Sequence, residues 1–284
     1  MSDDRESRNE VFTANEARNA GFQTRSVMGD DFGFEIPVET VPLPSNGKTY
    51  GQNSSLHGAE VVQIKAMTAK EEDILTSKAL IKKGIVIESL VKSCLIDKSI
   101  NVEEMLSGDR NALMTAIRIT GYGAQYQVDV ECPACGERSK QDFDLSDLPI
   151  KRLEVEPLEV GENIFEFELP VTKKTVNFKF LTGKDENEIS TIAERKRKKG
   201  IVNDNSVTTR LKHSILSIDG ITDKHKIGVF VGNMPARDSL ALRKFIDSNE
   251  PGIEMKSWMD CPHCQESSEV RLPMGASFFW PDSE

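Results

Sequence analysis

The sequence has few of the residues that enzymes and membrane-spanning proteins need. It contains four histidines, and no apolar run approaches the roughly 18 residues that would cross a bilayer. GxSxG, Walker, HExxH and helix-opening GxGxxG motifs are all missing, and no histidine is spaced against a plausible nucleophile. We therefore expect a protein that is not an enzyme. The polar start of the chain lacks the apolar core of a signal peptide, so we expect a soluble protein of the cytoplasm.

Positively charged residues are also too few to balance the negative ones, since the chain has 36 lysines and arginines and 46 aspartates and glutamates. The net charge of -10 disfavours general nucleic-acid binding, which draws most of its affinity from phosphate neutralisation. One basic run, Arg195–Lys199, stands at the end of an expected helix. A solvated helix C-terminus favoured by the helix dipole is the better explanation, and contact with nucleic acid or an acidic partner is the alternative.

Cysteine is scarce too, yet four of the five cysteines form two CxxC pairs. In a reducing compartment such pairs indicate metal or redox chemistry rather than disulfides. Each pair lies between two expected strands and is therefore interpreted as the tip of a β-hairpin. Two residues between cysteines let both sulfurs face one metal, and two such tips supply the four thiolates of a closed, structural zinc site. The predicted zinc ligands are Cys132, Cys135, Cys261 and Cys264.

Two alternatives to this zinc site stay open. A thioredoxin-like dithiol has one CxxC at the start of a helix that follows a strand, whereas both pairs here lie between expected strands. A vestigial site without metal is the second. His263 sits inside the second pair and should point outward, while Cys94 is most simply a small residue of the core.

An internal repeat explains why 125 residues separate the two pairs. Aligning Cys132 with Cys261, an offset of 129, matches further residues without a gap. The matches include Asp109 with Asp238, Leu113 with Leu242, Ile117 with Ile246 and, at a shorter offset upstream, Lys82–Val86 with Lys198–Val202. Small loop insertions would produce the change of offset, and chance similarity is the alternative. We predict a first repeat at 34–149 and a second at 150–274, with zinc clamping one to the other.

Each repeat is expected to contain the same elements. A strand leads to a threonine, Thr68 or Thr182, that can cap a helix; Glu71 completes a capping box in the first repeat, whereas Asp185 is too short for an ideal one. A second helix (85–95 or 207–216) and a third follow, and then the CxxC hairpin. Aspartates 109 and 238 are expected to be N-caps of the third helices. Before the first repeat's strand, Asn46-Gly47 predicts a tight turn between two short strands.

The predicted fold class is α+β, an internally duplicated strand–helices–β-hairpin repeat whose two hairpin tips are joined by a four-cysteine zinc site. Two segments lie outside the repeats. Residues 1–33, rich in charged and polar side chains, are predicted to be a mobile N-terminal arm. Residues 275–284 form an aromatic C-terminal tail. Its Phe278, Phe279 and Trp280 either fold back onto the core or anchor another subunit, which makes them candidate partner-binding residues.

Several segments together resemble the baseplate hub protein family of T4-like contractile-tailed bacteriophages. They are LPSNGKTYG (43–51), MTAKEEDILTSKALIKKG (67–84), GDRNALMTAIRITGYG (108–123), the CPACG tip and the closing FFWP (278–281). The resemblance covers residues 40–145 well and the second repeat loosely. It implies a non-enzymatic role in building the tail baseplate in the host cytoplasm, with the virion as a further location, through contacts with other tail proteins. It brings no catalytic residues, and the zinc site rests on cysteine spacing alone.

We therefore predict a non-enzymatic tail baseplate hub component or hub-assembly factor that acts through protein–protein contacts, without a small-molecule substrate or a membrane. The alternative from another class is a zinc-ribbon nucleic-acid-binding adaptor that uses Arg195–Lys199. A thiol oxidoreductase is a third. Salt-sensitive binding to DNA or RNA would favour the adaptor, and a reactive cysteine of low pKa would favour the oxidoreductase.

Overall fold

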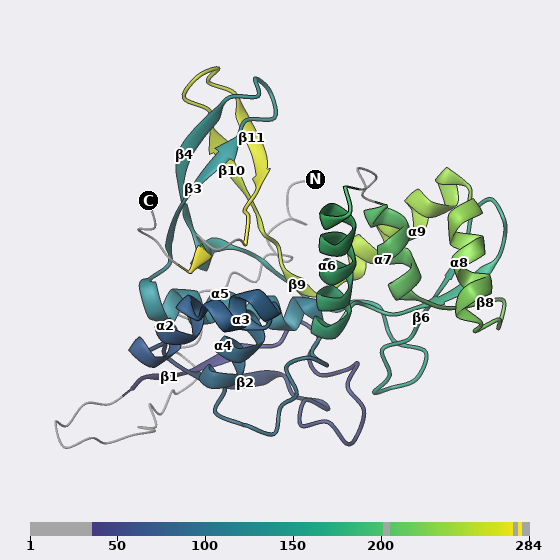
Figure 1. The fold of residues 1–284 in the computed structure, drawn as a ribbon, viewed down its shortest axis with the longest axis horizontal. Helices are drawn as coiled ribbons and strands as arrows, with labels where there is room; N and C mark the ends of the chain where they lie inside the picture. Colours follow the sequence, from purple (N-terminus) through teal and green to yellow (C-terminus); the bar gives the residue numbers. More distant parts are fainter. Residues whose placement is uncertain (1–35, 201–204, 275–277, 280–284) are drawn as a thin grey trace, which may run out of the picture.

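A computed structural model describes residues 36–200, 205–274 and 278–279, which form a mixed α+β fold of small antiparallel sheets and helices (Figure 1). The predicted arm at 1–33 and Trp280 lie outside these residues. Among the described helices, none is both long and apolar enough to cross a membrane.

The first half of the chain runs from a strand pair through a group of helices to a hairpin. Its elements are β1 (Val38–Pro42), β2 (Val61–Lys65), α2 (Ala69–Thr76), α3 (Lys78–Lys83), α4 (Val86–Cys94), α5 (Ser107–Tyr122), β3 (Gln125–Glu131), β4 (Arg138–Asp144), the 3₁₀ turn η2 (Leu145–Asp147) and β5 (Ile150–Lys151). Strands β1 and β2 pair with each other, as do β3 and β4.

The second half also runs from strands through helices to a hairpin. Its elements are β6 (Phe165–Glu168), β7 (Thr175–Phe178), α6 (Gly183–Lys198), α7 (Ser206–Ser214), β8 (Ile215–Ile218), α8 (Lys224–Asn233), α9 (Ala236–Asn249), β9 (Gly252–Ile253), β10 (Lys256–Asp260) and β11 (Ser267–Arg271). Strand β8 extends the β6–β7 pair, and β9 pairs with β5 of the first half. Derivation of both halves from one duplicated segment stays a prediction.

The observed helix boundaries agree closely with the predicted ones in the first half and less closely in the second. The helix expected at 85–95 is α4, but the one expected at 207–216 ends at Ser214 because Ile215 and Leu216 enter strand β8. Helix α8 was not predicted. Its sequence, KHKIGVFVGN, buries only Ile227 and Val231, which form too short an apolar stripe to stand out.

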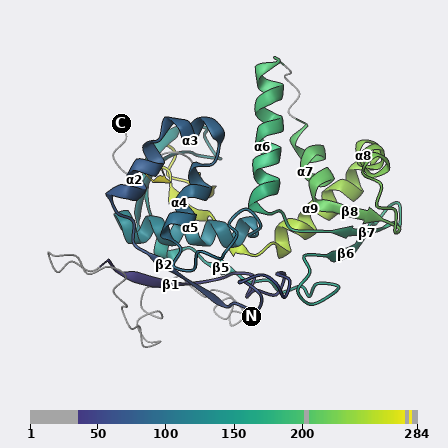
Figure 2. The same cartoon turned by 60° about the horizontal axis from the view of Figure 1, so that its bottom comes forward.

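Helix α5 lies at the centre of the fold, against both halves (Figure 2). Leu113 and Ile117, one turn apart, are fully buried, as their spacing predicts. The first turn of α5 crosses the β9 segment so closely that a Cβ on Gly108 would stand 1.7 Å from the carbonyl oxygen of Pro251. The two halves can therefore approach this closely only because residue 108 has no side chain.

Asp109 and Asp238 are not the N-caps that the sequence predicted. The N-caps of α5 and α9 are Leu106 and Pro235, and each aspartate lies two residues into the helix proper. Both carboxylates are fully buried. Each carboxylate accepts its hydrogen bonds from a distant loop rather than capping the start of its own helix.

The two aspartates anchor equivalent loops. Asp109 accepts hydrogen bonds from the Ser45 backbone N–H (3.0 Å), the Ser45 hydroxyl (2.6 Å) and the Tyr50 hydroxyl (2.6 Å), all in the β1–β2 loop. Asp238 accepts from two backbone N–H groups of the β6–β7 loop at 2.7 and 3.1 Å. Burial raises the pKa of Asp109, and these donors oppose the rise. The LPSNGKTYG segment is therefore held to α5 by its serine and tyrosine.

The predicted turn at Asn46-Gly47 is present, with φ angles of 50° and 68°. It does not join the strands directly, because the β1–β2 connection spans residues 43–60. A Cβ on Gly47 would lie 2.3 Å from the backbone nitrogen of Ala59, so the rest of the loop packs onto the turn and requires glycine there.

Glu71 closes the first capping box from a fully buried position. It accepts from the Thr68 backbone (3.0 Å), from the Lys65 ammonium (2.7 Å) and from the Ser93 hydroxyl (2.6 Å). Burial alone would raise the pKa of Glu71, but these hydrogen bonds outweigh it and lower the pKa to about 2. The charged carboxylate is therefore the form that the fold stabilises.

The second capping box is complete as well, contrary to the prediction. The Thr182 N–H donates to the Asp185 carboxylate at 2.9 Å, and the Asp185 N–H donates to the Thr182 hydroxyl at 3.3 Å. Lys179 pairs with Asp185 at 2.7 Å, as Lys65 does with Glu71. The shorter aspartate therefore reaches the N-cap backbone as the glutamate of the first box does.

Candidate metal centre

The β3–β4 and β10–β11 hairpins stand together above α5, and their tips meet (Figure 1). The Sγ atoms of Cys132 and Cys264 are 3.8 Å apart, those of Cys135 and Cys261 are 3.7 Å apart, and all four lie within 4.8 Å of one another. A disulfide would bring two sulfurs to about 2.05 Å. A tetrahedral ion with Zn–S bonds of about 2.3 Å has sulfur–sulfur edges of about 3.8 Å. The predicted ligands therefore come together at distances that suit zinc.

Both tips are built in the same way. The Cys132 N–H donates to the Glu137 carbonyl (2.9 Å), and the Gly136 N–H donates to the Cys132 carbonyl (2.8 Å). The second tip repeats these bonds around Cys261 at 3.0 and 2.9 Å. The residue after the second cysteine adopts a left-handed conformation in each tip, at φ 76° for Gly136 and 61° for Gln265. Two separate segments thus present their sulfurs with one backbone geometry.

The protonation of the thiols also favours a cation. Backbone N–H groups of Cys264 and His263 lower the pKa of Cys261 to about 7. The Glu137 N–H lowers the pKa of Cys135, but desolvation and the neighbouring thiols outweigh it and raise that pKa to about 12. One thiolate thus makes ionisation of the next harder. A bound divalent cation removes this conflict because it neutralises the thiolates together.

The surroundings fit a closed site better than a redox site. Both CxxC pairs lie between strands rather than at a helix N-terminus, where reactive dithiols are found. Within the described residues, the four cysteines are the group of His, Cys, Asp and Glu side chains placed to hold a metal. His263 is exposed and outside this group. Cys94 is fully buried, and burial raises its pKa to about 12, as suits a core residue.

The aromatic tail packs at the base of the hairpins. Phe278 and Phe279 are 0% and 2% exposed, and the Phe278 ring lies edge-on to Tyr126 with centroids 5.3 Å apart. The buried Arg118 guanidinium donates to the Phe278 carbonyl (2.7 Å) and to two carbonyls at the α5–β3 junction (2.6 and 3.0 Å). Of the two alternatives for the tail, folding back onto the core describes both phenylalanines, and a role for the tail in binding a partner stays a prediction.

The halves are also joined away from the cysteines. The Tyr126 hydroxyl donates to the Pro273 carbonyl (2.7 Å), and β5 pairs with β9. Near the start of α6, the Gly183 N–H donates to the Met105 carbonyl (2.9 Å), and the Ser107 N–H donates to the Leu181 carbonyl (2.8 Å). A metal at the tips would therefore be one of several connections between the halves.

The basic run Arg195–Lys199 forms the last turn and C-cap of α6. Lys198 pairs with Glu194 at 3.7 Å on the exposed surface of the same helix. Cations at a helix C-terminus are favoured by the helix dipole. This arrangement suits the solvated helix end that the sequence favoured over a nucleic-acid contact.

Comparisons with known proteins identify a family. Neither the search of curated proteins nor that of solved structures found a significant match. The family model for the T4 bacteriophage base plate protein matches residues 36–280. This range extends through the second half and both CxxC tips, well beyond the region 40–145 in which the sequence resemblance was clearest. The chain belongs to the T4 bacteriophage base plate protein family.

Proposed function

We propose that this chain is a non-enzymatic component or assembly factor of the hub of a phage tail base plate. The observation that carries the proposal is the family match over residues 36–280, nearly all of the described chain. Membership of this family implies contacts with other tail proteins. The chain would work by holding such proteins in place, in the virion tail or while the tail is built in the host cytoplasm.

We also propose that the four cysteines bind one structural zinc ion. Four thiolates fill every position of a tetrahedral ion, so neither water nor a substrate has a coordination position. Zinc would fix the two hairpin tips relative to each other and supply no chemistry. Sulfur–sulfur distances of 3.7 and 3.8 Å support this proposal.

Duplication of one ancestral segment is the third part of the proposal. It is supported by the two hairpin tips with equivalent hydrogen bonds and by the two buried aspartates that anchor equivalent loops. It gives a reason for the 125 residues between the cysteine pairs, because each pair belongs to its own copy.

A complementation experiment tests the function. A phage that lacks this gene is grown in hosts that express the wild-type chain, the Cys132→Ser variant or no chain, and tails are examined by electron microscopy. We expect complete base plates with the wild-type chain, fewer with the variant and none without the chain. Normal base plates and normal infectivity without the chain would overturn the proposal.

The nucleic-acid adaptor makes a different prediction. Binding to a DNA or RNA duplex should then weaken steeply as salt rises, and Arg195→Gln should reduce the salt dependence. The hub proposal expects no such binding by the acidic chain at physiological salt.

A further inference from the structure

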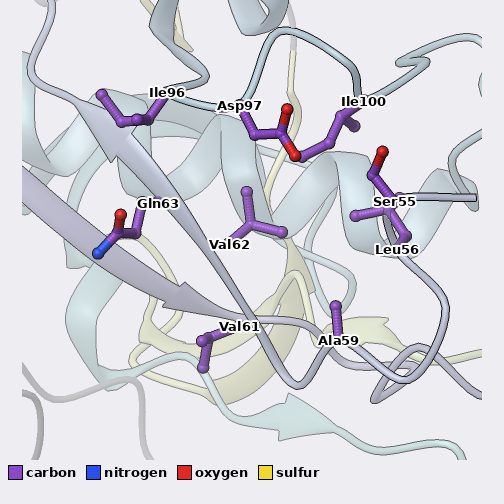
Figure 3. Close-up of a pocket in the computed structure, with 9 residues that line it drawn as sticks. All are labelled: Ser55, Leu56, Ala59, Val61, Val62, Gln63, Ile96, Asp97 and Ile100. Atoms are coloured by element: carbon purple, nitrogen blue, oxygen red, sulfur yellow. The ribbon is translucent and has the colours of Figure 1, made fainter.

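The hollow beside β2 offers little to a ligand. It has a volume of ≈ 190 Å³, with Ser55, Gln63 and Asp97 among its lining residues (Figure 3). The Ser55 hydroxyl is 2.7 Å from the Ser99 hydroxyl, which donates to Asp97 at 2.6 Å. None of the described lining side chains has a buried polar atom without a partner. The surface of the second hairpin carries more information.

Strand β10 of this hairpin presents an exposed tryptophan. Trp258 is 68% exposed and is the largest of the exposed apolar side chains in the described part of the chain. It shares the outward face of β10 with Lys256 and Asp260, while Met259 on the opposite face is buried. Both hairpins project beyond the helices of the first half (Figure 1). A tryptophan in this place suits contact with a protein, because tryptophan is enriched among the residues that dominate interfaces.

The edge of β10 that faces away from β11 is unpaired within the described residues. At one end of the hairpin the Leu272 N–H donates to the Met255 carbonyl (2.9 Å), and at the other the Cys261 N–H donates to the Glu266 carbonyl (3.0 Å). Hydrogen-bonded and non-hydrogen-bonded pairs alternate along an antiparallel ladder. Counting from either end places Trp258 in a non-hydrogen-bonded pair, so its N–H and C=O point toward the free edge.

The sequence of this free edge is complementary to itself. When a second copy of β10 lies antiparallel to the first with Trp258 opposite Trp258, Lys256 of each copy lies opposite Asp260 of the other. The two Trp258 residues can then exchange backbone hydrogen bonds, and the Asp260 N–H can donate to the Lys256 carbonyl of the other copy. Lys256 lies 3.2 Å from Glu254, and its three N–H donors leave capacity for a second carboxylate.

The equivalent strand of the first hairpin lacks these features. At the offset of 129, Trp258 corresponds to Asp129 of β3. The exposed side chains of β3 are polar or acidic, namely Gln125, Gln127, Asp129 and Glu131. A second copy of β3 centred on Asp129 would place like charges opposite each other. Gln125 and Gln127 donate to carboxylates across the hairpin at 3.0 and 2.9 Å, as suits a face in contact with water.

We propose that β10 pairs with β10 of a second copy of this chain, antiparallel and around a two-fold axis at Trp258. The result is a four-stranded sheet in the order β11–β10–β10–β11, with the two tryptophans side by side. A two-stranded hairpin alone is marginally stable, and extending the sheet strengthens it. A two-fold axis lets one patch serve as both surfaces of the interface. A lysine on an open edge discourages most strands, whereas a second copy offers Asp260 to Lys256.

Sedimentation velocity of the full-length chain, purified without a chelator, measures this pairing over a range of concentrations. The mass should rise from the 31.6 kDa of one chain to twice that value. Trp258→Thr keeps a residue suited to strands and should raise the dimer Kd at least about 30-fold. Asp129→Thr, the equivalent change in β3, is the matched control and should dimerise as the wild type does.

Exchange of the charges tests the antiparallel register. Lys256→Asp and Asp260→Lys each place like charges opposite each other at both ends of the interface, so each variant alone should dimerise about tenfold more weakly. A mixture of the two variants should form heterodimers with wild-type affinity, because every opposed pair then has opposite signs. The double variant Lys256→Asp with Asp260→Lys should also recover the dimer.

Melting temperature and circular dichroism show that each variant is folded. A wild-type chain that stays monomeric at all concentrations would overturn the pairing, and so would a dimer that Trp258→Thr leaves unchanged. Failure of the two charge variants to form heterodimers would overturn the proposed register. None of these results bears on the role in the base plate, which the complementation experiment tests separately.

Discussion

Removal of the proposed zinc ion is the perturbation that tests the structure most directly. Two sulfur–sulfur distances, 3.7 and 3.8 Å, match the edge of about 3.8 Å expected for a tetrahedral ion with Zn–S bonds of about 2.3 Å, and all four sulfurs lie within 4.8 Å of one another. Free zinc at about 1,000 times its Kd would stabilise the folded chain by about 4 kcal/mol. Chelation should therefore lower the melting temperature by roughly 10 °C for a chain of this size. The chain should stay folded, because other contacts join the halves.

Three measurements follow this change. Elemental analysis should find one zinc per chain, and X-ray absorption should find four sulfurs at about 2.3 Å. Hydrogen exchange after chelation should speed up in the β3–β4 and β10–β11 hairpins, since a two-stranded hairpin alone is marginal. It should change little in α5. Cys132→Ser should lose the metal, and Cys94→Ala should keep it as the matched control.

Several results would refute this reasoning. Two zinc ions per chain would mean that the pairs do not share a site. Unchanged metal content in Cys132→Ser would mean that this sulfur is not a ligand. Equal loss of exchange protection in α5 and in the hairpins would show that zinc, rather than the contacts at Pro273, β5 and β9, holds the halves together.

Five substitutions, one of them a control, test other parts of the fold by urea unfolding. Gly108→Ala places a Cβ within 1.7 Å of a backbone oxygen and should lower the free energy of unfolding by more than about 3 kcal/mol. Gly232→Ala is the control, because open space surrounds Gly232, and it should be neutral or slightly stabilising. Equal effects of the two variants would contradict the close packing at Gly108. Arg118→Met removes the guanidinium that donates to three carbonyls and should lower the free energy of unfolding by about 3–5 kcal/mol. A loss below about 1 kcal/mol would show that these hydrogen bonds do not hold the tail to α5. Gln265→Gly relieves a φ of 61° and should stabilise the second tip by up to about 1 kcal/mol; a loss of stability would contradict this. The folded pKa of Glu71, about 2, lies below its ordinary 4.5, so its contribution is present above pH 4.5 and is lost as the pH falls toward 2. Glu71→Gln should therefore lose up to roughly 3 kcal/mol at pH 7 and show a flatter acid limb, and an unchanged acid limb would refute the assignment.

Features that depend on neighbours along the chain were predictable from the sequence. The alternation of Tyr126, Val128 and Val130 predicts a half-buried strand, and β3 buries these three residues. The CxxC spacing predicts two-thiol tips because the turn that aims both sulfurs is local. The capping threonines and the helical stripe of Leu113 and Ile117 follow for the same reason.

Features that depend on distant segments were decided by the tertiary structure. Asp109 has the sequence pattern of an N-cap, but donors 59 and 64 residues away turned it into the anchor of a loop. The tail phenylalanines could equally have anchored a partner, and only the space beside Tyr126 places them in the core.

Spacing along the chain, by itself, determined which cysteines pair into tips and the chemistry they could share. It could not determine that the tips meet. Periodicity and turn chemistry act over a few residues, whereas a shared metal site depends on how closely packed surfaces fit. That fit rests on details such as the missing side chain at Gly108, which become meaningful only when the opposing backbone is in place.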